Sequence, residues 1–126
     1  MAGVDETAGE QIQIAGITLD TFLNSLTDTP RIRFVKVDVE GAELAVLQGA
    51  LVLIRKQRPI FFLEINHQFC LRYDYQPKDI FDFMHSHEYQ GFVIHFEQRL
   101  PVQADTYSGS GDVLFMPKEL LEVEKA

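Results

Sequence analysis

The 126-residue chain lacks several features that mark secreted and membrane proteins. Cys70 is its single cysteine, which excludes an internal disulfide and fits a reducing compartment. No apolar run approaches the roughly 20 residues that a membrane helix needs. Residues 1–11 are small and acidic, with neither the basic nor the apolar region of an export signal. We therefore expect a cytoplasmic protein with no membrane partner.

Basic residues are also few, at 11 Lys and Arg against 19 Asp and Glu, and the net charge is −8. Because binding to a phosphate backbone needs a basic surface, nucleic acid is excluded as the main partner. The chain as a whole is 46% hydrophobic and contains ten Phe, which is typical of one soluble globular domain.

The most informative segment is FVKVDVEGAE at 34–43. It predicts a buried strand that delivers Asp38 and Glu40 at its C-terminal end and then turns directly into a helix. Ligands of open α/β sheets bind just outside the carboxyl ends of the strands, so these two carboxylates stand where chemistry is expected.

A helix and a second strand should follow. Apolar residues at helical spacing predict one helix over 43–56, with Glu43 on its polar face, and IFFLEIN at 60–66 predicts another buried strand. Two continuous apolar strands joined by a helix form a βαβ unit with parallel strands. Lys36 would lie on a buried face of the first strand, so we expect it to pair with an acid or to act as a base of lowered pKa.

The remaining elements are shorter. We predict an edge strand over 11–18, a helix over 19–26, a polar loop over 66–76 and a helix from Pro77 to about His87. Strands at 91–96 and 112–116 have no helix between them and should pair antiparallel. A charged helical tail is expected after Pro117.

Several of these blocks resemble the FkbM-type S-adenosylmethionine-dependent methyltransferases. The resemblance spans about residues 12–119 and rests most strongly on KVDVEGAE at 36–43. Supporting blocks are TLDTFL at 18–23, LQGA at 47–50, RPI at 58–60, LEIN at 63–66, GF at 91–92 and DVLFMPKE at 112–119.

The chain departs from the family at its N-terminal side. Family members bind the cofactor with an acidic, Gly-rich loop after their first strand, and no Asp/Glu-x-Gly-x-Gly follows an apolar strand here. The resemblance therefore implies the C-terminal half of a Rossmann-like α/β fold, a parallel βαβ unit with a terminal antiparallel strand pair. We divide the chain into a flexible segment 1–11, this half-domain at 12–119 and a charged tail at 120–126.

The resemblance assigns a role to Asp38, and the other candidate site residues follow from their places at the strand ends. It places Asp38 beside the transferred methyl group, as a contact to the cofactor or to an acceptor hydroxyl, although a turn carboxylate capping the next helix is the alternative. Glu40, two residues further on, is a candidate catalytic residue. The alternative is that it is an acid placed there because a helix N-terminus favours negative charge. His67 is a candidate general base, or a surface loop histidine. Glu64 and Asn66 would bind the substrate.

Four oxygen-bearing side chains at this sheet end (Asp38, Glu40, Glu64 and Asn66) could hold Mg²⁺. We adopt the alternative of solvated or amide-bonded acids, so no metal is predicted. The implied activity is methylation, with S-adenosylmethionine as cofactor, of a hydroxyl on a small molecule or glycan. This lone chain is expected to be incomplete for cofactor binding.

A second interpretation is non-catalytic. Without a first strand beside it, the segment 32–39 becomes an exposed apolar edge with unpaired N–H and C=O groups. The chain would then be a half-Rossmann unit that associates with itself, or with a separate partner, through this edge.

Overall fold

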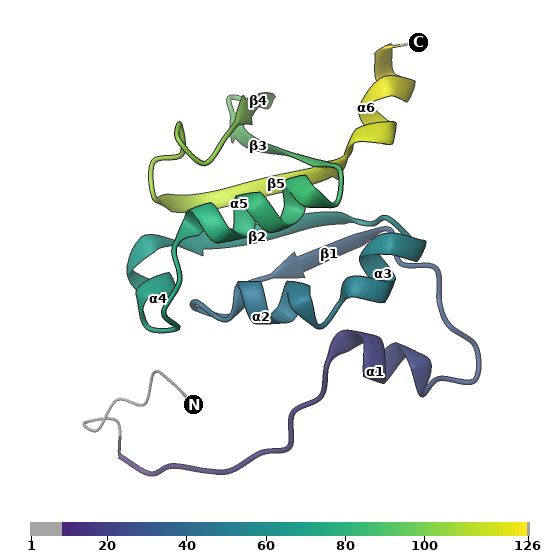
Figure 1. Ribbon diagram of the computed structural model, residues 1–126, viewed down its shortest axis with the longest axis vertical. Helices are drawn as coiled ribbons and strands as arrows, with labels where there is room; N and C mark the ends of the chain where they lie inside the picture. Colours follow the sequence, from purple (N-terminus) through teal and green to yellow (C-terminus); the bar gives the residue numbers. More distant parts are fainter. Residues whose placement is uncertain (1–8, 126) are drawn as a thin grey trace.

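The computed structural model describes residues 9–125, and Figure 1 shows the arrangement of its elements. Its strands are β1 (Phe34–Val37), β2 (Ile60–Asn66), β3 (Tyr89–His95), β4 (Gln98–Val102) and β5 (Ser110–Pro117). Its helices are α1 (Leu19–Asn24), α2 (Glu43–Gln48), α3 (Leu51–Lys56), α4 (His67–Leu71), α5 (Pro77–Ser86) and α6 (Lys118–Lys125). Residues 1–8, most of the predicted flexible segment, and residue 126 of the predicted tail lie outside this description.

The strands form one five-stranded sheet in the order β1-β2-β5-β3-β4. β1 and β2 are parallel, with Phe34 opposite Ile60 and Val37 opposite Leu63. The other neighbours are antiparallel, including the expected pair β3 and β5. The predicted α/β fold, with a parallel βαβ unit and a terminal antiparallel pair, is confirmed.

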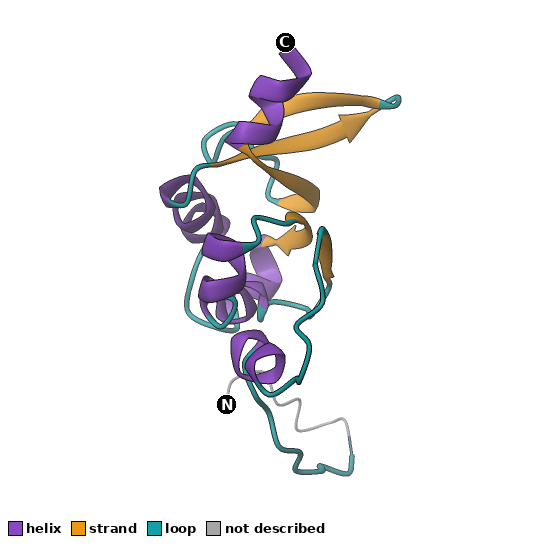
Figure 2. Ribbon diagram, turned by 90° about the vertical axis from the view of Figure 1, so that its right-hand side faces the viewer, coloured by secondary structure: helices purple, strands orange, loops and turns teal. Residues whose placement is uncertain are grey.

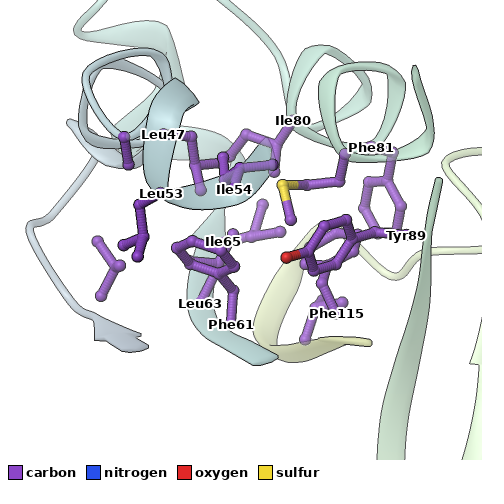
Figure 3. Close-up of a cluster of buried hydrophobic side chains, with 14 of the residues drawn as sticks. Leu47, Leu53, Ile54, Phe61, Leu63, Ile65, Ile80, Phe81, Tyr89 and Phe115 are labelled. Carbon is purple, nitrogen blue, oxygen red and sulfur yellow. The ribbon is translucent and has the colours of Figure 1, made fainter. Parts of the chain in front are cut away.

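The helices α2 to α5 lie on one side of the sheet, as the side view in Figure 2 shows. Successive strand residues point to opposite faces, and the β2 residues Phe61, Leu63 and Ile65 are fully buried beneath these helices. Leu47 and Ile54 from the helices meet them in the core (Figure 3). The alternate residues of β2 are only half-buried, because they face the opposite side of the sheet.

That opposite face is open over β1 and β2 in the described part of the chain. Phe34 and Phe62 stack on it with their ring centroids 6.5 Å apart, and Phe34 remains 54% exposed. Lys36 shares this face and is exposed, so the prediction that it pairs with an acid in a buried environment is wrong. The reason is that only one face of β1 is covered by helices.

Other elements differ from the sequence prediction. The expected helix over 43–56 is divided at Gly49 and Ala50 into α2 and α3. A Cβ at Gly49 would stand 2.9 Å from the Thr18 Cβ, so the glycine permits a close approach between this corner and the start of α1. The segment 11–18 is no strand, and Ile12 and Ile14 are 79% and 85% exposed. The expected loop 66–76 contains α4, and β4 was not predicted.

Candidate functional site

The turn between β1 and α2 is held in place by the side chain of Glu43. This carboxylate accepts the Val39 N–H at 2.9 Å and the Gly41 N–H at 3.0 Å, and it is only 1% exposed. Burial raises the pKa of the Glu43 carboxyl, and the two backbone donors act against that shift. Glu43 therefore does not lie on the polar face of its helix, as its spacing predicts, but under the turn that carries Asp38.

Gly41 completes the turn. Its φ of 113° lies in the region that favours glycine, and a Cβ there would stand 2.4 Å from the backbone oxygen of Phe69 in α4. The Tyr75 hydroxyl donates to the Gly41 carbonyl at 2.5 Å. Burial raises the pKa of Tyr75, so this hydroxyl remains a donor over the physiological range. The turn is thus fixed from below by Glu43 and from the side by α4 and Tyr75.

Asp38 and Glu64 meet at the carboxyl end of this parallel pair. Asp38 directly follows β1, and Glu64 is the fifth residue of β2. The Asp38 carboxylate, by hydrogen bonding with the Glu64 carboxyl and by charge repulsion, raises the pKa of Glu64. The parallel register, which pairs Val37 with Leu63, brings the next residue of each segment to the same edge of the sheet. Asp38 and Glu64 therefore form an acidic pair at this edge.

A third acid extends this pair. Asp112 in β5 is the cross-strand partner of Glu64, and its negative charge further raises the pKa of the Glu64 carboxyl. Beside it lies a hollow of about 300 Å³ on the sheet. The hollow is lined by Phe62, Tyr107, Ser108, Ser110 and Asp112 among others. An apolar ring, three hydroxyl groups and the Asp112 carboxylate thus line a space beside the cross-strand partner of Glu64.

The other candidate residues have local structural roles or none. The Asn66 Oδ1 caps α4 by accepting the N–H groups of Gln68 at 2.9 Å and Phe69 at 3.2 Å. His67 begins α4 with its side chain exposed, and its N–H donates to the Gly109 carbonyl at 2.7 Å. Glu40 lies in the turn with a φ of 50° and is exposed. Asn66 is therefore anchored, whereas Glu40 and His67 are free to reach a bound molecule.

Sequence reasoning missed three residues of this site. Glu43 is an acid in the first turn of a helix, and such an acid normally lies at the surface, where it interacts favourably with the helix dipole. Tyr75 comes from a segment that was predicted as loop, and the position of Asp112 depends on the β2–β5 register. Only the second acid of the EGAE sequence at 40–43, two residues after the glycine, could have indicated a carboxylate folded back on the turn.

Two further findings concern metals and membranes. Within residues 9–125, no group of three or more His, Cys, Asp or Glu side chains is arranged to hold a metal ion. None of the helices in the same part of the chain is long and apolar enough to cross a membrane.

Comparison with known proteins gives one match. The family model described as "Methyltransferase FkbM domain" matches residues 3–92, which is more than half of the chain and includes β1, β2 and the turn that carries Asp38. No curated protein and no solved structure matches the chain.

Proposed function

The chain belongs to the FkbM methyltransferase family, and from that premise we propose that its site serves methyl transfer from S-adenosylmethionine to a hydroxyl group. The observation that carries the proposal is the carboxyl pair of Asp38 and Glu64 at the carboxyl ends of two neighbouring parallel strands. This is the location in open α/β sheets at which ligands bind.

The charge of the site suits the cofactor. S-adenosylmethionine, when bound, supplies a methyl group that is already activated on a positively charged sulfonium. Asp38 would hold it, because a carboxylate beside a sulfonium or ammonium group gains favourable Coulomb energy. Exposed Glu40, two residues further along the rigid turn, adds a second negative charge within the same loop.

The acceptor would occupy the hollow beside the pair. The Phe62 ring offers an apolar surface for a sugar or small ring, while Ser110 and Asp112 offer hydrogen bonds to hydroxyl groups. Glu64 and Asn66 lie along β2 between this hollow and the end of the strand. A hydroxyl placed between the hollow and Asp38 would be next to a group able to take its proton.

The proton balance follows from this placement. The cofactor, when bound, would supply the methyl group, and the Asp38–Glu64 pair would take the proton that leaves the acceptor hydroxyl as the oxygen–carbon bond forms and the carbon–sulfur bond breaks. The Glu64 carboxyl, whose pKa is raised by the neighbouring Asp38 and Asp112, would hold such a proton better than an isolated exposed carboxylate does. His67 is the second candidate to accept it, from the first turn of α4.

Calorimetric titration of the chain with S-adenosylmethionine and with S-adenosylhomocysteine tests the proposal, because the two differ in the methyl group and its positive charge. We expect the methylated cofactor to bind about fivefold more tightly, since a charge pair near a wet surface is worth roughly 1 kcal/mol. Asp38→Asn should remove this preference, and the matched change Asp28→Asn, at an exposed acid after α1, should not. Equal affinity of the wild-type chain for both ligands, a preference that survives Asp38→Asn, or no binding of either ligand at millimolar concentration would contradict the proposed role.

A further inference from the structure

The outermost strand of the sheet has one side without a partner in the described part of the chain. β1 pairs only with β2, and the Ile60 N–H donates to the Arg33 carbonyl at 2.9 Å. Hydrogen bonds in a parallel ladder alternate along each strand, so the odd-numbered residues of β1 bond to β2. The N–H and C=O groups of Phe34 and Lys36 therefore point away from β2, toward the free side.

This edge is also apolar on the open face of the sheet. Phe34 is 54% exposed although it stacks on Phe62. An edge strand with free N–H and C=O groups and an exposed aromatic side chain is a template for pairing with another strand, and Lys36 is the one charge within β1 that opposes this.

The charges around β1 indicate which strand fits. The segment begins with Arg31 and Arg33 and ends with Asp38 and Glu40. Antiparallel pairing of two copies brings the basic start of one against the acidic end of the other, whereas parallel pairing would align like charges. We propose that β1 pairs antiparallel with β1 of a second copy of this chain around a two-fold axis, which joins the two sheets into one.

The side chains also select a register. With the axis at Val35, Phe34 of each copy lies opposite Lys36 of the other, and each such pair exchanges both backbone hydrogen bonds. The Lys36 stem then packs over an aromatic ring, and its ammonium group lies over the ring face. With the axis at Lys36 instead, two ammonium groups would be directly opposed, which is unfavourable.

Sedimentation velocity tests the association, independently of methyl transfer. At about 0.15 M salt, which screens the net charge beyond ~8 Å, we expect a reversible change from monomer to dimer between about 5 and about 500 µM. Hydrogen exchange at the Phe34 and Lys36 amides should slow over the same range. A monomer at the highest concentration would overturn the proposal, and slow exchange in that monomer would mean that the chain covers its own edge.

Two matched variants test the register. Phe34→Glu and Phe34→Lys remove the same ring from the stack on Phe62, so any loss of folding is shared between them. In the Val35-centred register, the glutamate faces Lys36 of the second copy and the lysine faces a like charge. We expect the Phe34→Glu dimer to be at least about tenfold tighter, because the pair occurs twice around the axis. Equal affinities, or the reverse order, would overturn the proposed interface.

Discussion

Replacing Glu43 by alanine tests the claim that this buried carboxylate builds the turn that carries Asp38. The variant leaves the Gly41 N–H, which lies in a buried turn, without its acceptor at 3.0 Å. It also removes the acceptor of the Val39 N–H, although Val39 is 40% exposed, so water can replace that bond. A buried donor left unsatisfied costs about 1–3 kcal/mol, and the second, partly solvated donor costs less.

We therefore expect Glu43→Ala to lower the free energy of unfolding by about 2–4 kcal/mol, a large share of the ~5–15 kcal/mol of a typical domain. Glu43→Gln keeps one oxygen for the Gly41 N–H and should lose about half as much. Urea unfolding at pH 7, followed by circular dichroism, measures both. Gln48→Ala, at an exposed position of the same helix, is the control and should stay within about 0.5 kcal/mol of the wild type. If Glu43→Ala behaves like this control, Glu43 does not hold the turn.

Three further predictions concern neighbouring residues. Gly41→Ala should destabilise the chain by at least about 2 kcal/mol in the same urea assay, because the residue has a positive φ and the alanine Cβ would meet the Phe69 backbone oxygen. A smaller loss would show that α4 can move away. Asn66→Ala should cost about 1 kcal/mol as a lost helix cap, and an unchanged midpoint would argue against that role. Glu64→Gln tests how stability depends on pH. The pKa of Glu64 is higher in the folded state than in the unfolded state, so its protonated form stabilises the fold at pH values below the unfolded-state pKa. This stabilisation is lost as the pH rises through the folded-state pKa. Relative to the wild type, the Gln variant should gain stability between pH 4 and pH 7, and a pH-independent difference would contradict the effect of Asp38 and Asp112 on Glu64.

The elements that the sequence predicts well are those with unbroken patterns. The run from Phe61 to Ile65 is apolar on nearly every position, and Pro77 opens a helix whose spacing holds to its end. The short α4 has no such period, because it begins at the Asn66 cap and ends after five residues. β4 contains Arg99 and Pro101, which an edge strand tolerates. Because these residues interrupt the apolar pattern, the sequence does not predict this strand. Ile12 and Ile14 show the opposite error, a predicted strand that does not form. Their alternation is compatible with a strand, but a strand also needs a neighbouring strand to pair with.

The candidate site was predictable to the same limited extent. Asp38 and Glu64 could be brought together from sequence, because the carboxyl ends of adjacent parallel strands meet at one edge of the sheet. The contribution of Asp112 depends on an antiparallel register that pairs it with Glu64, and no local pattern encodes that register. The role of Glu43 depends on a turn folding back over its own helix, which helical spacing alone does not reveal.

A pH titration of the Glu64 side-chain carboxyl, followed by its ¹³C chemical shift in the wild type and in Asp38→Asn, tests the acidic pair of Asp38 and Glu64 most directly. The structure predicts a Glu64 pKa above its ordinary value in the wild type, falling back toward that value when Asp38 loses its charge. An ordinary Glu64 pKa in both proteins would show that the Asp38 carboxylate does not act on Glu64, and the proposed site would lose its basis.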